Sequence, residues 1–228
     1  MILYIFYTKI VKKMQIRPIF IIATNTNVGK TYTTLKLIEE FGKLGIKPVV
    51  YKPIETGVAD IPADASALLQ KAKNVNPCLQ NLTSFDITSY TFTLPAAPYV
   101  ADSKKEIDIS KLKNDYEKLS LLGDILLIEG AGGLMTPISK ELKMIDLIEL
   151  FDAHVLLVTS SRLGSINDTL LSMEAMKNRQ LSFDWCVNAY DDIDTFDLVT
   201  KPYYDEKLPS WWSVQNGLSV FAKKCILK

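Results

Sequence analysis

The stretch "TNTNVGKT", residues 24–31, ends in Gly-Lys-Thr and follows the apolar run "PIFIIA". A strand that leads through a small polar loop into a helix is the context in which backbone N–H groups and the helix dipole bind phosphate. In such a loop Gly29 permits close backbone approach, Lys30 supplies positive charge to the terminal phosphates, and the Thr31 hydroxyl can ligate Mg²⁺. The usual leading glycine is replaced by Ala23, so the surroundings of the loop must support the prediction.

Two carboxylates and a second lysine could complete a triphosphate site around this loop. Glu129 ends the apolar run "DILLIE", and Gly130 and Gly132 follow it, at the kind of strand end where ligands bind open α/β sheets. Lys52 in "YKPIETG" ends a second apolar run and could neutralise charge on a transferring phosphoryl group, although most lysines are solvated surface charges. Asp64 taken alone is a helix N-cap. It becomes a candidate Mg²⁺ ligand only together with Glu129, because Mg²⁺ usually takes one or two carboxylates beside nucleotide phosphates.

Strand-like and helix-like stretches alternate along the chain and would position these residues. Buried, β-branched runs predict strands at residues 18–23, 47–53, 124–130, 154–159 and 183–188. Apolar residues at helical spacing, together with capping signals, predict helices at residues 30–44, 64–72, 108–123, 144–151 and 165–178. The alternation predicts an α/β fold with a mainly parallel β-sheet flanked by helices on both faces. Beyond Asn188 the pattern weakens and predicts no element.

Composition limits the class of protein. Lys plus Arg and Asp plus Glu number 26 each among 228 residues, so the formal net charge is zero and the usual electrostatic basis for binding nucleic acid or an anionic membrane is missing. Three well-separated cysteines are typical of reduced thiols in a cytoplasmic protein. Every apolar run is too short to span a bilayer. Residues 15–228 are predicted to form a single domain, and residues 1–14 an N-terminal extension outside it.

In this order and context, the motifs resemble the ATP-dependent dethiobiotin synthetases, a family of the P-loop NTPase superfamily. The matching segments lie within residues 19–188 and are "TNTNVGKT", "YKPIETG", "ADASAL", "YTFTLPAAP", "IEGAGGLMTPI", "LGSIND" and a final "VN". The resemblance implies a P-loop NTPase fold and an ATP-dependent carbon–nitrogen ligase of biotin biosynthesis. Its substrates would be 7,8-diaminononanoate, CO₂ and ATP, with Mg²⁺ as cofactor and neither nucleic acid nor membrane as partner.

The resemblance also implies roles for individual residues. CO₂ would add to one amine to form a carbamate, a carbamate oxygen would attack the γ-phosphate of ATP, and the second amine would close the ring. Lys52 matches the catalytic lysine of the family, Lys30 adds positive charge, and Thr26 contacts the amine or carbamate. The expected Mg²⁺ ligands are Thr31, Asp64 and Glu129. The expected nucleotide contacts are Asn27, Val28, Gly29, Lys30, Thr31, Tyr32, Asp64, Glu129, Gly130, Ala131, Gly132, Asn188, Ala189 and Pro209.

The substrate side of the site would involve two separate segments. Thr56 is expected to contact the diamine. In the family, the turn "LGSIND" receives the substrate carboxylate across a two-fold axis, which implies a homodimer with shared active sites. The residues of this turn expected to contact substrate are Gly164, Ser165, Ile166 and Asn167. From the sequence alone, Asn167 or Asp168 is a helix cap.

The chain departs from the family pattern around the base of the nucleotide. Asn27 occupies a position where many relatives carry an acidic residue. Asn188 matches the family's adenine-reading asparagine, but Ala189 replaces the acidic residue that often follows it. Pro209 is the remnant of a second base-contacting loop. These departures predict weak selectivity for the base.

The alternatives are other phosphate-loop proteins. A switch ATPase of the partitioning or septum-site type usually carries an additional lysine early in the loop, where this chain has Thr24 and Asn25. An amidating synthase of the cobyrinic acid type would need a glutamine-handling domain, for which the chain has no room. The single histidine, His154, and the adjacent Trp211 and Trp212 are predicted to have packing roles.

Overall fold

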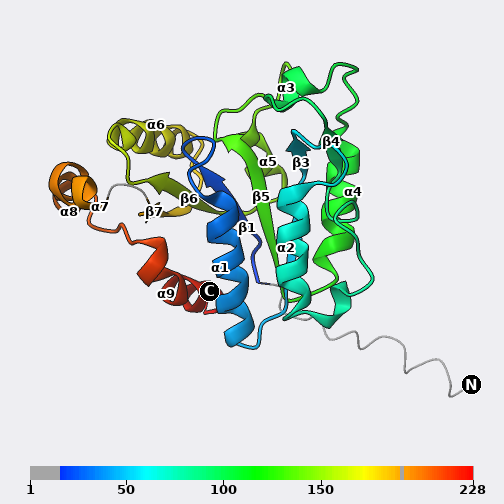
Figure 1. Ribbon diagram of the computed structural model, residues 1–228, viewed down its shortest axis with the longest axis horizontal. Helices are drawn as coiled ribbons and strands as arrows, with labels where there is room; N and C mark the ends of the chain where they lie inside the picture. The colour runs from blue at the N-terminus through cyan, green and yellow to red at the C-terminus, as the bar shows by residue number, and fades with distance from the viewer. Residues whose placement is uncertain (1–15, 191–192, 228) are drawn as a thin grey trace, which may run out of the picture.

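The computed structural model describes residues 16–190 and 193–227, and the predicted extension at residues 1–14 lies outside them. The centre of the described molecule is a five-stranded sheet in the order β2-β5-β1-β6-β7, with every neighbouring pair parallel (Figure 1). Its strands are β1 (Ile19–Ala23), β2 (Pro48–Tyr51), β5 (Ile125–Gly133), β6 (His154–Ser160) and β7 (Phe183–Asn188). The predicted α/β fold is confirmed.

The central strand β1 lies between β5 and β6, with Ile19 opposite both Leu127 and His154. Every residue of β1 is buried, which explains why its sequence is a continuous apolar run instead of an alternating one. From β1 the chain crosses to β2 at one edge, and later continues through β5 to β6 and β7 on the other side. The strand order reverses at β1, so the carboxyl end of β1 borders the crevice where open α/β sheets bind ligands.

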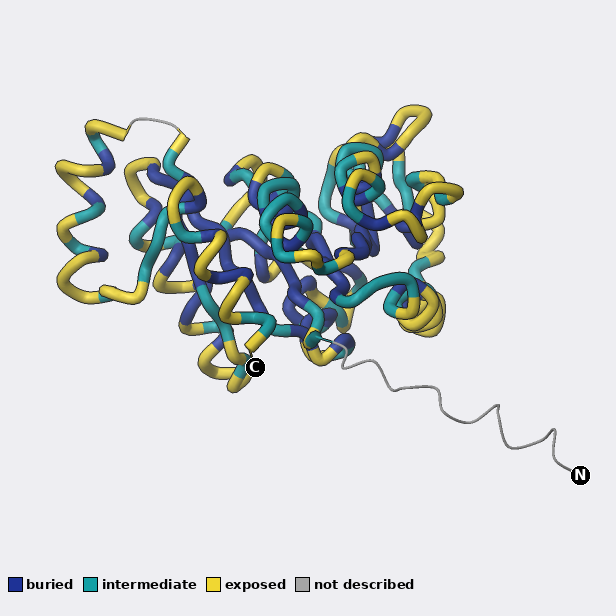
Figure 2. The backbone as a smooth tube through the Cα atoms, turned by 90° about the horizontal axis from the view of Figure 1, so that it is seen from below, coloured by how far each residue is buried: buried dark blue, intermediate teal, exposed yellow. Residues whose placement is uncertain are grey.

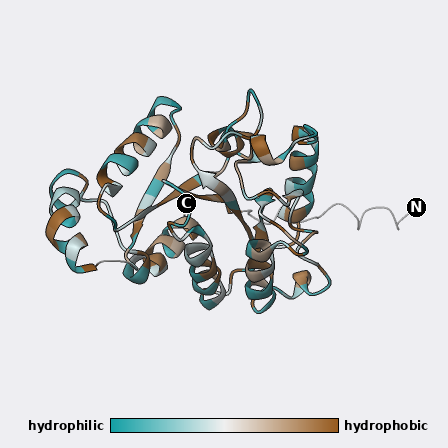
Figure 3. Ribbon diagram, turned by 45° about the horizontal axis from the view of Figure 1, so that its top comes forward, coloured by the Kyte–Doolittle hydropathy of each residue, from teal (hydrophilic) through white to brown (hydrophobic). Residues whose placement is uncertain are grey.

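Helices cover both faces of the sheet, as right-handed crossover connections require (Figure 3). The helices on one face are α1 (Lys30–Lys43), α2 (Ala63–Lys73) and α9 (Val214–Ile226). Those on the opposite face are α4 (Ile109–Ser120), α5 (Met144–Leu150) and α6 (Ser165–Asn178). The buried part of the backbone is concentrated between these layers (Figure 2). Helix α4 begins directly after Asp108, whose carboxylate accepts the backbone N–H of Ser110, so the predicted cap is confirmed.

The stretch predicted as a strand at residues 47–53 contains β2 and ends in a turn that leads to a second strand. After β2, Lys52 donates its backbone N–H to the carbonyl of Ile87 at 2.9 Å instead of continuing the ladder with β5. The proline that follows has no N–H to donate. The chain then forms β3 (Ile54–Thr56), which pairs with β4 (Tyr90–Phe92) in a separate two-stranded sheet. The predicted strand is therefore confirmed, but it ends at Tyr51, two residues earlier than predicted.

The region after β7, where the pattern predicted no element, is mainly helical in its described part. Its elements before α9 are α7 (Ile193–Thr195), the π-helical turn η2 (Phe196–Thr200) and α8 (Lys201–Lys207). Two further short elements, η1 (Pro77–Leu79) and α3 (Pro98–Ala101), lie in earlier connections. Trp211 packs edge-on against Phe196 with 5.7 Å between ring centroids, and Trp212 stacks on Phe221 at 5.5 Å. The predicted packing role of both tryptophans is confirmed.

His154 lies at the amino end of β6, away from the crevice. Its Nε2 is 2.8 Å from Oδ2 of Asp184 in β7, and Nζ of Lys224 in α9 is 2.5 Å from the other oxygen of the same carboxylate. These contacts connect α9 to the sheet, so the structural role predicted for His154 is confirmed.

Buried apolar side chains form one cluster that extends from Ile19 in β1 to Ala222 in α9. The assignment of residues 15–228 to a single domain stays a prediction. Across the described ranges, each helix is too short or too polar to cross a membrane.

Candidate active site

The loop between β1 and α1 ends in a backbone conformation that favours glycine. Gly29 is the N-cap of α1 and has a φ of 98°, in the left-handed region. A Cβ added there would lie 2.0 Å from Nδ2 of Asn188. Asn27 also has a positive φ, 58°, which asparagine tolerates better than most residues. The loop therefore folds closely around the amino end of α1, where unpaired N–H groups can bind an anion.

Residues from the end of β7 and from α9 hold this loop in place. Nδ2 of Asn188 donates to the carbonyl of Val28 at 3.0 Å, and its Oδ1 accepts from Nε2 of Gln215 at 3.3 Å. The Tyr190 hydroxyl donates to the carbonyl of Asn27 at 2.7 Å. The loop conformation therefore depends on segments that lie far away in the sequence.

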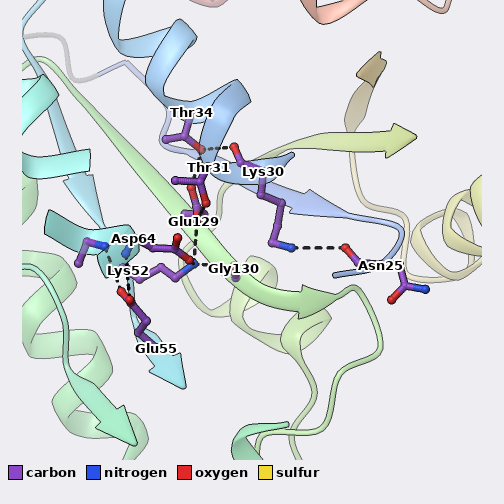
Figure 4. Close-up of polar contacts among 10 residues, drawn as sticks. Asn25, Lys30, Thr31, Thr34, Lys52, Glu55, Asp64, Glu129 and Gly130 are labelled. Atoms are coloured by element: carbon purple, nitrogen blue, oxygen red, sulfur yellow. Dashed lines mark hydrogen bonds and ion pairs between the residues drawn. The ribbon is translucent and has the colours of Figure 1, made fainter. Parts of the chain in front are cut away.

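Lys52 lies at the centre of a cluster of charged groups beside the loop (Figure 4). Its Nζ is 2.7 Å from Oε1 of Glu129 and 3.0 Å from Oδ2 of Asp64, and it donates to the carbonyl of Gly130 at 3.4 Å. The Lys52 side chain is 3% exposed, and that of Glu129 is fully buried. Burial disfavours the ammonium, but the charges and hydrogen bonds of Glu129 and Asp64 outweigh it and raise the pKa of Lys52. Lys52 is thus a fixed positive charge at the carboxyl edge of the sheet.

Glu129 is held by two threonines of α1. Thr31 Oγ1 donates to Oε1 at 2.9 Å, and Thr34 Oγ1 donates to Oε2 at 2.8 Å. Residues three apart lie on the same face of a helix, so both hydroxyls reach the end of β5. Together with Lys52 they satisfy a carboxylate that is buried away from water.

Lys30 is the first residue of α1, and its Nζ donates to the carbonyl of Asn25 at 3.4 Å. Burial and, secondarily, the positive charge of Lys52 lower the pKa of Lys30 to about 8. The carboxylates of Glu129 and Asp64 act in the opposite sense without cancelling this effect. Two lysines that repel each other beside an anion-binding loop suit a polyanionic ligand. Residues with strongly shifted pKa values also cluster at functional sites.

Asp64 is not the N-cap that the sequence predicted. The N-cap of α2 is Pro62, which makes no side-chain cap hydrogen bond. Burial opposes ionisation of Asp64, but the charge and hydrogen bond of Lys52 prevail and lower its pKa. The capping carboxylate comes instead from Glu55, which accepts the backbone N–H groups of Asp64 at 2.9 Å and Ala65 at 3.0 Å. The prediction was wrong because the helix start is satisfied from another element.

A cavity of about 740 Å³ opens at this edge of the sheet, within the usual size of a small-molecule site. The predicted residues that line it are Thr26, Asn27, Gly29, Lys30, Thr31, Tyr32, Lys52, Thr56, Asp64, Ala131, Gly132 and Asn188. Three more, Val28, Glu129 and Gly130, contact lining residues through the hydrogen bonds given above. The structure therefore brings most of the predicted set together.

The remaining predicted residues lie outside the lining of this cavity. The carbonyl of Ala189 accepts from Gln215, a lining residue, at 3.1 Å. Pro209 lies in the turn between α8 and α9. The segment 164–167 forms the start of α6.

Gly164, with a φ of 93°, is the N-cap of α6, so neither Asn167 nor Asp168 caps this helix, contrary to the prediction from sequence. A second cavity of about 410 Å³ is lined by Asp168 and Leu171 of α6 and by Thr26, which it shares with the first cavity. The Thr26 side of the loop is therefore accessible from two directions.

Sequence reasoning missed four residues of the site: Thr34, Glu55, Tyr190 and Gln215. Thr34 carried a usable signal, because it lies one helical turn after Thr31. Glu55 lies inside the motif "YKPIETG", between the predicted site residues Lys52 and Thr56. Tyr190 and Gln215 carried no signal, since the packing of α9 against β7 brings Gln215 to Asn188 and Ala189 at the end of β7.

Oxygen donors for a hard cation gather around Lys52. Glu129 and Asp64 both reach the same ammonium, so these two carboxylates are close enough to share one cation. Thr31 is hydrogen-bonded to Glu129 and adds a hydroxyl. Among the described residues, no group of three or more His, Cys, Asp or Glu side chains is arranged to hold a metal ion. The donor set suits Mg²⁺ shared with nucleotide phosphates and not an all-protein metal centre.

Comparison with known proteins identifies the family. The model of a family described as AAA domain matches residues 17–184. An ATP-dependent dethiobiotin synthetase from Sulfurovum sp. is 53% identical over 205 residues, which are 90% of this chain and 98% of the relative. The corresponding synthetase from Wolinella succinogenes is 42% identical over 195 residues, which are 84% of this chain and 89% of the relative. This chain belongs to the dethiobiotin synthetase family.

Membership in the dethiobiotin synthetase family confirms the resemblance predicted from the motifs and makes the chain a carbon–nitrogen ligase of biotin biosynthesis. Among solved structures, a plasmid partition protein from Borrelia burgdorferi is 14% identical, with a TM-score of 0.55 over 91% of this chain and 99% of that one. At this identity the likeness shows the fold alone. It gives no support to a partitioning role for this chain.

Proposed function

We propose that this chain is a cytoplasmic enzyme that converts 7,8-diaminononanoate, CO₂ and ATP to dethiobiotin, ADP and phosphate with Mg²⁺. The observation that carries the proposal is the buried Lys52, held between Glu129 and Asp64 beside a phosphate-type loop. Transfer of a phosphoryl group to a carbamate oxygen needs charge neutralisation and positioning more than a strong base. The cluster around Lys52 supplies both.

The triphosphate of ATP would lie at the amino end of α1. The loop from Asn27 to Thr31 offers backbone N–H groups there, and Lys30 adds a positive charge whose protonated form the phosphates would stabilise. Lys52 would stabilise the charge that develops on the γ-phosphoryl group. Its burial strengthens this effect, because electrostatic interactions are stronger in a site with little water.

Mg²⁺ would be held by Thr31, Asp64 and Glu129. The two carboxylates already converge on the Lys52 ammonium, and the Thr31 hydroxyl is hydrogen-bonded to Glu129. When bound, the ion neutralises charge on the β- and γ-phosphate oxygens. Lys52 contacts both carboxylates. We expect its ammonium to exchange part of that contact for phosphoryl oxygens when ATP binds.

The ring-forming steps balance without an additional reagent. One amine forms an N–C bond to CO₂ and loses a proton, giving the carbamate. A carbamate oxygen then attacks the γ-phosphorus, and ADP leaves. The second amine forms an N–C bond to the carbamoyl carbon and loses a proton, and phosphate leaves with the activated oxygen. The amine and carbamate would lie between Thr26 and Thr56. Thr26 borders both cavities, and Thr56 lines the larger one together with Lys52.

We propose that residues 164–167 of a second copy bind the substrate carboxylate in a homodimer. Neither described cavity of one chain is lined by these residues. Three leucines around the same turn and helix are exposed, Leu163 at 81%, Leu170 at 37% and Leu171 at 63%, and such a surface suits burial against a partner. A molar mass of two chains in solution, and recovered activity on mixing Lys52→Ala with Asn167→Ala protein, would support the shared site. A monomeric active enzyme would refute it.

For the base of ATP, we propose contact with Asn188 and Ala189, with Pro209 on the connection to α9. The Asn188 amide is already engaged with Val28 and Gln215, so it has one N–H and one acceptor position left for the base. Ala189 adds no polar side chain beside this amide, so weak selectivity is expected. Comparing kcat/KM for ATP, GTP and CTP measures it directly, and a preference for ATP of more than about 10³-fold would contradict this expectation.

The experiment that tests the function incubates the purified protein with Mg²⁺, ATP, bicarbonate and 7,8-diaminononanoate. Phosphate and a cyclic urea should form in equal amounts, and phosphate release should require the diamine. A substrate analogue with a single amine serves as the control, because it can form a carbamate but cannot close the ring. Phosphate release that ignores the diamine but responds to DNA or lipid vesicles would replace the proposal with a switch ATPase.

A further inference from the structure

Glu55 is a buried carboxylate that the proposed mechanism does not use. It lies in the middle of β3, is 6% exposed, and lines the same cavity as Lys52. Its Oε1 accepts the backbone N–H of Asp64 at 2.9 Å, and its Oε2 accepts that of Ala65 at 3.0 Å. Figure 4 shows Glu55 beside Lys52 and Asp64. Both carboxylate oxygens are thus used to hold the start of another element.

The start of α2 needs such an external partner. The first N–H groups of a helix have no partner within it, and a Ser, Thr, Asp or Asn at the N-cap usually supplies one. Here the N-cap is Pro62, which makes no side-chain cap hydrogen bond. Glu55 replaces the missing cap, and its negative charge also complements the helix dipole. It therefore connects β3 rigidly to the first turn of α2.

The contact with Glu55 fixes Asp64, whose carboxylate faces the Lys52 ammonium. Asp64 receives the Glu55 contact on its backbone N–H and directs its own carboxylate to Nζ of Lys52 at 3.0 Å. Glu55 itself is fixed, because its strand pairs with β4 and places it opposite Thr91. If this backbone contact were lost, the first turn of α2 could move, and the two carboxylates would no longer converge.

We propose that Glu55 is a positioning residue for Mg²⁺ binding, because it fixes the Asp64 backbone so that the Asp64 carboxylate converges with Glu129 on one ion. This inference rests on the proposed function, in which Asp64 and Glu129 hold Mg²⁺. Groups that orient metal ligands typically change metal affinity by about 10- to 100-fold when they are removed. The same range is expected for Glu55.

The test measures Mg²⁺ coupling by calorimetry, as the ratio of the Kd of a non-hydrolysable ATP analogue in EDTA to its Kd in Mg²⁺. Glu55→Gln keeps the shape but presents an NH₂ group to one of the two N–H donors, and Glu55→Asp is too short to reach both. Each variant should lower the ratio about 10-fold, with Kd in EDTA within about twofold of wild type. Either variant is sufficient if the other proves insoluble.

Asp108→Ala is the matched control. It removes the carboxylate cap of α4, on the opposite face of the sheet from α2, so it should lower Tm without changing the Mg²⁺ ratio. If Glu55→Gln lowers Tm but keeps the wild-type ratio while Asp64→Asn abolishes the coupling, Glu55 is only a helix cap and the inference fails alone. If Asp64→Asn also keeps the wild-type ratio, the proposed ion site fails, and this inference fails with it.

Discussion

Lys30 gives nucleotide binding a pH dependence that an ordinary lysine would not. In the nucleotide-free protein its burial, and then repulsion by Lys52, lower its pKa from 10.5 to about 8. Phosphate binding needs the ammonium form, so the affinity for nucleotide should be full below about pH 8 and fall as the pH rises through that value. Bound phosphates stabilise the ammonium and restore a high pKa, so binding above pH 8 must take up a proton.

The size of the effect follows from that pKa. If Lys30 titrates at about 8 when free and above 10 when bound, Kd should rise about 30-fold between about pH 7 and pH 9.5. A lysine with an unperturbed pKa would change Kd by only about 10% over the same interval. The neighbouring charges stay constant over this range, because the pKa of Lys52 is raised and that of Asp64 is lowered.

Calorimetric titration with a non-hydrolysable ATP analogue, in buffers of different ionisation enthalpy, measures both Kd and proton uptake. Proton uptake should approach one per nucleotide near about pH 9 in the wild type. In Lys30→Met it should vanish together with the pH dependence, while overall affinity is lower. A wild-type Kd that stays constant within about threefold, or an equal slope in Lys30→Met, would refute the role assigned to Lys30.

Three further predictions concern the groups around Lys30. Lys52→Ala should leave nucleotide binding measurable but lower turnover by about 100-fold or more, because a preorganised charge is lost. Single-turnover phosphate release measures this effect. Near-normal turnover would remove Lys52 from the mechanism. Gly29→Ala should weaken nucleotide binding about 10-fold or more, because its Cβ would lie 2.0 Å from Asn188 Nδ2 and would displace that amide from the Val28 carbonyl. Gly45→Ala, also at positive φ but with no atom within 4 Å, should keep wild-type affinity. Equal affinities in the two variants would contradict this reading of the loop. Thr34→Val removes a hydrogen bond to the buried Glu129 and should cost about 1–3 kcal/mol in the free energy of unfolding. It should also lower turnover about 10-fold. Thr88→Val should not do so, because the hydroxyl of this buried threonine donates to the carbonyl of Ser84 and not to a charged group of the site.

Some features of this protein are encoded locally, and the sequence was sufficient to find them. The continuous apolar runs of β1 and β5 predict strands covered on both faces, and the structure buries all of β1 and the first six residues of β5. Asp108 caps α4 from the adjacent position, so its role could be predicted from neighbouring residues alone. The loop that ends in Gly29 and Lys30 was recognisable because its strand, turn and helix are consecutive in the chain.

Other features depend on contacts between distant segments, and only the tertiary structure decided them. Asp64 was assigned as a cap because nothing in the local sequence shows that Glu55 already holds the start of α2. The direction of Lys52 follows from a backbone hydrogen bond to Ile87, and the contact of Gln215 with Asn188 follows from the packing of α9 on β7. Periodicity and capping are short-range properties of a chain, whereas the convergence of charges on one cation depends on how the strands are ordered.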